Sequence, residues 1–129
     1  MEQKIFSEFI KKFIELEFYG FMHDIKYHDD ESFDCTLRSP SDKFSIWLAT
    51  CNSEITIGLK TPDGNTGIHT HISCYEIEDL DICLKQLSKI INDVIDDKLI
   101  LYREANGHYN WGNYAEFLGK IGAERFFWK

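Results

Sequence analysis

The chain has 129 residues, of which 28% are charged and 15% are aromatic, and its formal net charge is −8 at pH 7. This length predicts one domain that can bury a hydrophobic core without disulfide support, and the many aromatic residues argue against disorder. Because contacts to phosphates need clustered Lys and Arg, the acidic balance argues against direct binding to nucleic acid.

The cysteines and the N-terminus indicate where such a chain would act. Cys35, Cys51, Cys74 and Cys83 form no C-x-x-C pair, which excludes a zinc ribbon or a thioredoxin-type motif. The first residues lack the apolar core and cleavage site of a signal peptide, and no apolar run approaches the roughly 20 residues that span a bilayer. We therefore expect a cytoplasmic protein with reduced thiols, three of them acting as small hydrophobes.

The first predicted element is a helix that begins near the N-terminus and ends near Gly20. Its apolar residues recur at helical spacing, and they are Ile5, Phe6, Phe9, Ile10, Phe13 and Ile14. Lysines and glutamates of mixed sign fill the opposite side. This pattern predicts a helix that faces the core rather than a membrane surface.

Five segments with alternating side chains follow, at residues 21–28, 33–38, 44–49, 55–60 and 68–74. In the first of them Phe21, His23, Ile25 and Tyr27 alternate with the residues between them. Short loops rich in Pro, Gly, Asn, Asp and Ser separate the five segments. Strands joined this tightly predict an antiparallel meander.

The rest of the chain begins with a second amphipathic helix over about residues 78–96, with acids at its N-terminal end, where the helix dipole favours them. A strand over residues 99–103, a loop over residues 107–113 and a short helix from Tyr114 to Ile121 come next. The three aromatic residues at 126–128 must pack on the domain or on a partner. This order predicts an α+β fold, with an antiparallel sheet of five or six strands and helices packed on one face.

His69 and His71 are the first candidates for chemistry. Side chains on a strand alternate between faces, so both imidazoles point to the face opposite Ile68, Ile72 and Cys74. Two imidazoles can begin a Zn²⁺ site, but such a site needs a third or fourth ligand. The possible ligands lie far away in the sequence: His23, Asp24, His28, Asp34 and His108.

Two interpretations of this histidine pair stay open. One is a metal-dependent or acid–base enzyme that uses His69 and His71, and the other is a polar strand face that holds two histidines. Motifs for a serine nucleophile or for nucleotide binding do not occur, and Cys74 faces away from both imidazoles. We favour the second interpretation, which assigns no catalytic residue, no metal and no cofactor.

Carboxylates gather around residues 29–34, 76–81 and 93–97. Such density can pair with Arg and Lys of a basic partner, although solvated turns and helix ends explain any single cluster equally well. Tyr109 and Trp111 are large amphipathic residues of the kind enriched in interfaces, and also common as a lid over a sheet edge. The candidate partner-binding residues are Asp29, Asp30, Glu31, Asp34, Tyr109 and Trp111.

Residues 54–103 carry a longer pattern. The strand EITIGLK leads through a turn to a strand containing H-T-H, and an amphipathic helix and a further strand follow. This pattern resembles small bacterial immunity proteins of polymorphic and contact-dependent toxin systems. The resemblance implies a stoichiometric inhibitor, not an enzyme, that binds and blocks a cognate protein toxin, often a nuclease. Nuclease surfaces that bind phosphates are basic, which agrees with the acidic charge of this chain.

A third class of function stays open beside the immunity protein and the enzyme. A small-ligand-binding or scaffold domain would also be an acidic α+β protein without catalytic motifs. It would require a closed apolar pocket between the sheet and the helices.

Overall fold

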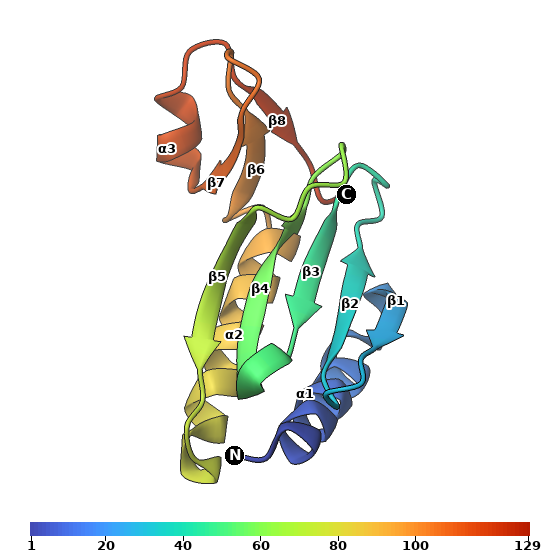
Figure 1. The fold of residues 1–129 in the computed structure, drawn as a ribbon. Helices are drawn as coiled ribbons and strands as arrows, with labels where there is room; N and C mark the ends of the chain where they lie inside the picture. Colours follow the sequence, from blue (N-terminus) through green and yellow to red (C-terminus); the bar gives the residue numbers. More distant parts are fainter.

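The computed structural model describes all 129 residues as an α+β fold (Figure 1). The elements follow one another in this order: α1 (Gln3–Phe18), β1 (Met22–Tyr27), β2 (Phe33–Arg38), β3 (Ser45–Ala49), β4 (Glu54–Lys60), β5 (Ile68–Ser73), α2 (Leu80–Ile95), β6 (Ile100–Arg103), β7 (Tyr109–Gly112), α3 (Tyr114–Leu118) and β8 (Glu124–Phe126). Strands β1 to β5 form an antiparallel sheet in chain order, here called sheet A. The predicted α+β class and meander are confirmed.

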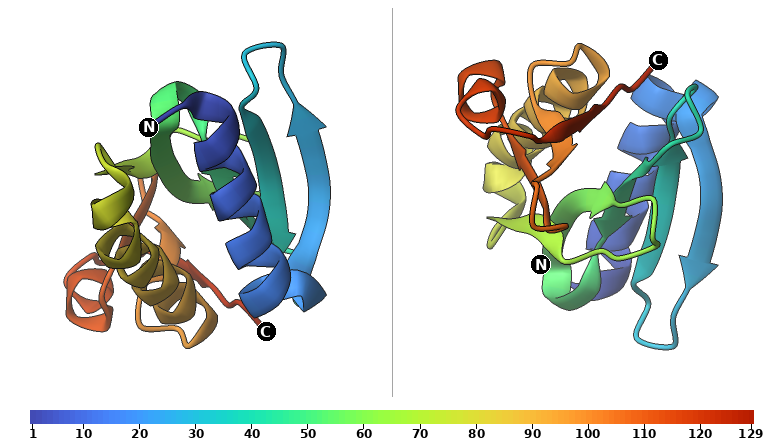
Figure 2. Two further views of the ribbon diagram at one scale, coloured as in Figure 1. Left: turned by 90° about the horizontal axis from the view of Figure 1, so that it is seen from below. Right: turned by 90° about the horizontal axis from the view of Figure 1, so that it is seen from above.

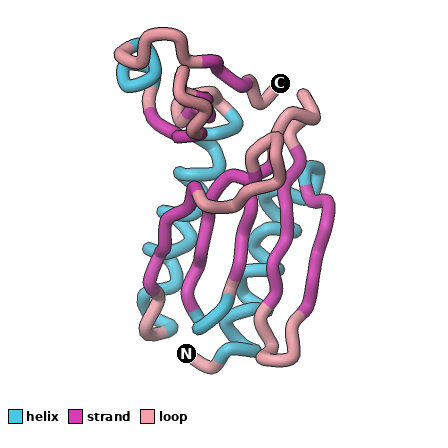
Figure 3. The backbone as a smooth tube through the Cα atoms, turned by 45° about the horizontal axis from the view of Figure 1, so that its top comes forward, coloured by secondary structure: helices cyan, strands magenta, loops and turns pink.

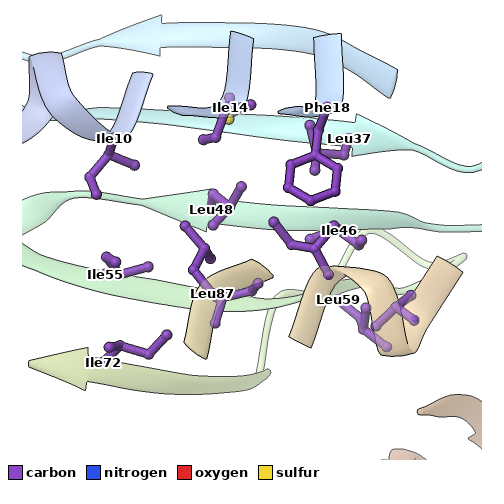
Figure 4. Close-up of a cluster of buried hydrophobic side chains, with 14 of the residues drawn as sticks. Ile10, Ile14, Phe18, Leu37, Ile46, Leu48, Ile55, Leu59, Ile72 and Leu87 are labelled. Atoms are coloured by element: carbon purple, nitrogen blue, oxygen red, sulfur yellow. The ribbon is translucent and has the colours of Figure 1, made fainter. Parts of the chain in front are cut away.

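Helices α1 and α2 lie side by side on one face of sheet A and leave its other face uncovered (Figures 2 and 3). The core between the sheet and these helices is a cluster of 22 buried residues. Figure 4 shows Ile10, Ile14 and Phe18 of α1 beside the apolar side chains of the sheet. The alternation of strands β2 to β5 explains this arrangement, because every second side chain points to the helices.

The N-terminal helix buries a narrower stripe than its sequence predicts. Phe6, Ile10 and Ile14 are fully buried, whereas Ile5 and Phe9 are exposed. The six predicted apolar positions cover more of the helix circumference than the sheet can contact. α1 packs against the β1–β3 half of sheet A. Only the side chains of α1 that point directly at the sheet are buried there.

The alternation predicted for the first strand is wrong at its beginning. The pairing of β1 with β2 runs Met22↔Leu37 and then Ile25↔Cys35, so a β-bulge lies between Met22 and Ile25. A bulge places two residues of one strand opposite one of its partner and shifts the alternation of faces. Met22 and Ile25 therefore both contact the core, and His23 is exposed.

The prediction of a loop over residues 107–113 is also wrong, because these residues contain β7. Strands β7 and β8 both pair antiparallel with β6 and form a separate sheet, here called sheet B. The strand predicted at 99–103 thus joins sheet B rather than extending sheet A, which keeps five strands. Sheet B and α3 project beyond one end of sheet A (Figure 1).

The C-terminal aromatic residues divide between the core and the surface. Trp128 is fully buried and makes edge-to-face contacts with Phe21 and Phe44, at centroid distances of 5.5 and 5.7 Å. Its backbone is held as well, since its carbonyl accepts a 3.1 Å hydrogen bond from the Ser41 amide. Phe127 remains exposed. The end of the chain therefore closes the core of sheet A.

No helix has the length and apolar character that a membrane crossing requires. The four cysteines are free; Cys35, Cys74 and Cys83 are buried and Cys51 is exposed. The expectation that three cysteines serve as small hydrophobes is confirmed.

Burial predicts a large difference in thiol reactivity. It raises the pKa of Cys35 and of Cys74 from 9.0 to about 12, so that at pH 8 only on the order of one in 10⁴ of these thiols is the reactive thiolate. We expect a disulfide reagent to titrate one thiol in the folded protein, Cys51, and four after denaturation.

A Cys51→Ser variant is the control, because it should leave no fast-reacting thiol in the fold. The same raised pKa values favour the neutral thiols in the folded state. Their stabilising contribution is therefore complete below pH 9 and is lost as the pH rises toward 12. Fast titration of two or more thiols at pH 8 would contradict the burial.

Candidate protein-interaction surface

The meander brings separate loops to one end of the molecule. In an antiparallel meander every second turn lies at the same end of the strands. The β1–β2 turn, the β3–β4 turn and the loop after β5 therefore lie at one end of sheet A, together with the N-terminus (Figure 1). Figure 2, left, looks onto this end. We call it the acidic end and define it as residues 1–3, 28–32, 50–54 and 73–81.

The acidic end carries carboxylates and no Lys or Arg. Two of the three acidic clusters of the sequence lie at this end of the molecule, and most of their side chains are exposed. The carboxylates are Glu2, Asp29, Asp30, Glu31, Glu54, Glu76, Glu78, Asp79 and Asp81. Asp34 lies next to them at the start of β2, half-buried, with Oδ1 3.6 Å from Nε2 of His28.

Hydrogen bonds hold the β1–β2 turn and one of its carboxylates, Asp30, in place. The His28 amide donates to the Ser32 carbonyl at 2.9 Å, and the Glu31 amide donates to the His28 carbonyl at 3.2 Å. Asp30 accepts hydrogen bonds from the hydroxyl and the amide of Ser32. These bonds hold the pKa of Asp30 below its usual value. The side chains of Asp29 and Glu31 make no hydrogen bond and are exposed to solvent.

Contacts between the loops make the acidic end one continuous surface. The Cys51 thiol lies 3.8 Å from Oδ2 of Asp30 and joins the first two turns. The Ser53 hydroxyl donates to the Met1 carbonyl at 3.0 Å, and the Met1 amino group donates to the Tyr75 carbonyl at 3.1 Å. An open hollow beside these contacts is lined by Met1, by residues 52–54 and by residues 73–75.

Exposed apolar residues lie among these carboxylates. Tyr75 is 76% exposed and Ile77 is 55% exposed, on either side of Glu76. Tyr27, 62% exposed, precedes the β1–β2 turn. Large amphipathic side chains surrounded by polar groups are the usual anchors of interfaces. The sequence analysis does not name Tyr75 and Ile77 as contact residues. Their position beside the second acidic cluster could have identified them.

The structure separates the six sequence-predicted contact residues into two groups. Asp29, Asp30, Glu31 and Asp34 lie together at the acidic end. Tyr109 and Trp111 lie in β7 at the opposite end of the molecule, half-buried against the core, and the ring of Tyr109 is 5.8 Å from that of Phe126. One partner of ordinary size therefore cannot use both groups in a single compact patch.

The two histidines of β5 lie on the uncovered face of sheet A, as the sequence predicts. The ring of His69 is 6.3 Å from that of Trp47 and 5.1 Å from that of His71. Nδ1 of His71 lies 2.7 Å from Oε1 of Glu54 and 3.0 Å from the Thr56 hydroxyl. No group of three or more His, Cys, Asp or Glu residues in the chain is arranged to hold a metal ion.

Five hollows of the protein are open depressions on the surface, lined mainly by polar residues. None of them is the closed apolar pocket that a small-ligand-binding domain would require. The space between sheet A and the helices is instead occupied by the core cluster.

Comparison of the chain with protein-family models, with characterised proteins and with solved structures finds no match.

Proposed function

We propose that the protein is a bacterial immunity protein that acts in the cytoplasm, where it binds a cognate protein toxin directly and thereby neutralises it. The observation that carries this proposal is the acidic end, where carboxylates without any Lys or Arg surround exposed Tyr75 and Ile77. The resemblance of residues 54–103 to immunity proteins supports the same function.

The two kinds of residue at the acidic end would contribute differently to binding. Carboxylates steer a basic partner and raise the association rate. A buried aromatic or aliphatic anchor slows dissociation, because apolar surface leaves water when it enters a pocket of the partner. A toxin that is a nuclease presents a basic surface to phosphates, so the acidic end would cover the surface on which its substrate binds.

Co-expression tests this function. The chain is produced together with the C-terminal domain of a toxin whose gene lies directly upstream of its own, and we expect the cells to survive and a 1:1 complex to purify. If the cells die and no complex forms, the proposed function fails for that pair.

Charge reversal locates the interface. We expect Asp29→Lys combined with Glu31→Lys to slow association with the toxic domain by about tenfold at physiological salt, because each substitution replaces attraction by repulsion. Neither side chain supports the turn, so the fold should be unaffected. Stopped-flow kinetics at two salt concentrations measure the effect, which should shrink at high salt.

The matched control is Glu17→Lys combined with Asp96→Lys. It makes the same change in net charge on exposed residues near the C-terminal ends of α1 and α2, away from the acidic end. Equal slowing by both pairs would mean that only the overall charge matters and would contradict the acidic end as the interface.

A further inference from the structure

The two histidines of β5 are held in the same way, each through Nδ1. Nδ1 of His69 lies 3.0 Å from the carbonyl oxygen of Thr66, and Nδ1 of His71 lies 2.7 Å from the Glu54 carboxylate. A carbonyl or an ionised carboxylate can only accept a hydrogen bond. The neutral tautomer that satisfies both acceptors carries the proton on Nδ1 and leaves the lone pair on Nε2; the Thr56 hydroxyl is a second contact of Nδ1 of His71, at 3.0 Å.

This arrangement is the one that surrounds metal-bound histidines in proteins. A ligating imidazole nearly always donates its other N–H to a carboxylate or a backbone carbonyl, which fixes the tautomer and the ring orientation. Here Glu54 and Thr66 supply these two acceptors before any ion is present. Glu54 is thus a positioning residue for His71. The Nε2 atoms of His69 and His71 are the nitrogens that remain free to bind an ion.

The spacing of the two rings also fits one shared ion. Their centroids are 5.1 Å apart and their planes meet at 77°. Two imidazoles that bind a tetrahedral Zn²⁺ at about 2.0–2.1 Å have centroids roughly 5 Å apart. Both side chains are exposed on the uncovered face of sheet A, with His71 51% exposed, so an ion can reach them from solvent.

We infer that His69 and His71 form a two-ligand site for a divalent transition ion of the Zn²⁺ class, bound through both Nε2 atoms. Because no third protein ligand lies beside them, water completes the coordination and the affinity is modest, on the order of 10 µM for half of a full ligand set. This site lies on the uncovered face of sheet A, and it shares with the acidic end only Glu54, which positions His71.

Titration of the full-length, EDTA-treated protein with ZnCl₂ tests the inference. We expect one Zn²⁺ per chain by calorimetry, and at least tenfold weaker binding for His69→Asn and for His71→Asn. Cu²⁺ should bind more tightly than Zn²⁺, and Mg²⁺ should not bind, because imidazole is a poor ligand for hard cations. His108→Asn, an exposed histidine in the β6–β7 turn, is the matched control and should bind like the wild type.

Long-range ¹H–¹⁵N NMR spectra of the metal-free wild type provide a second measurement that needs no variant. They should show the Nδ1–H tautomer for both His69 and His71, and Zn²⁺ should move the Nε2 resonances of these two residues alone. Binding that survives both single substitutions, or Nε2–H tautomers in the metal-free protein, would overturn the site.

Discussion

Replacing Trp128 by alanine is expected to lower the free energy of unfolding by about 3–5 kcal/mol, the usual cost of removing a large aromatic side chain from a core. Trp128 is the largest fully buried side chain of the protein. Its ring contacts Phe21, which precedes β1, and Phe44, which precedes β3. Removing the ring would leave a cavity at the end of sheet A, between the segments that the ring now joins. Little of this cavity can be filled by local collapse.

Urea denaturation followed by circular dichroism measures this loss. Phe127→Ala is the matched control, since the neighbouring ring is 52% exposed, and it should cost less than about 1 kcal/mol. Trp128→Phe is expected to fall between the two. It keeps an aromatic ring and removes the buried Nε1–H, which has no hydrogen-bond partner and weakens the fold by being unsatisfied. Equal stability of Trp128→Ala and Phe127→Ala would contradict the closing role of the C-terminus.

Local patterns were sufficient to predict most of sheet A. In strands β2 to β4 every second residue is apolar and buried, and a shift of one residue would turn Leu37, Ile46 or Leu59 from the core into solvent. The Pro, Gly, Asn and Asp residues between the strands of sheet A indicate the turns equally clearly. The meander itself then implies that the acids at 29–31 and at 76–81 lie at the same end of sheet A, so the acidic end follows from sequence and topology together.

Sheet B could not be predicted in this way. β7 has only four residues, Tyr109–Gly112, between turn-forming neighbours, and a segment this short looks like a loop until its partner strand is known. Whether β6 extends sheet A or pairs with β7 and β8 depends on tertiary contacts that no local pattern contains. The position of Tyr109 and Trp111 depends on that choice, whereas the acids depend only on the meander. The bulge in β1 has the same origin, since the alternation gives no sign of an inserted residue.

Gly58→Ala is expected to destabilise the protein by about 3 kcal/mol, at the upper end of the cost of overpacking a buried position. Gly58 pairs with Trp47 on one side and His69 on the other. An added Cβ would lie 2.1 Å from the carbonyl oxygen of Ile68 and 2.6 Å from Cβ of His69. A backbone carbonyl cannot rotate away as a flexible side chain can, so relief requires β5 to move from β4.

The absence of a side chain at Gly58 also explains a contact across three strands. β3 and β5 lie two strand spacings apart, about 9.6 Å, yet the rings of Trp47 and His69 are only 6.3 Å apart. They meet above the glycine. Any larger residue there would separate them and displace His69 from His71, so Gly58→Ala should abolish Zn²⁺ binding as well as lower stability.

Gly20→Ala is the matched control, because a Cβ added at Gly20 meets nothing within 4 Å. It should change the free energy of unfolding by less than about 0.5 kcal/mol. Hydrogen exchange locates the damage, since β5 is an edge strand and its amides should lose protection in Gly58→Ala before those of β2 and β3 do. If Gly58→Ala is instead as stable as Gly20→Ala, then Gly58 does not face His69. The pairing that places both imidazoles on one face beside Trp47 would then be wrong, and the metal site would fail together with it.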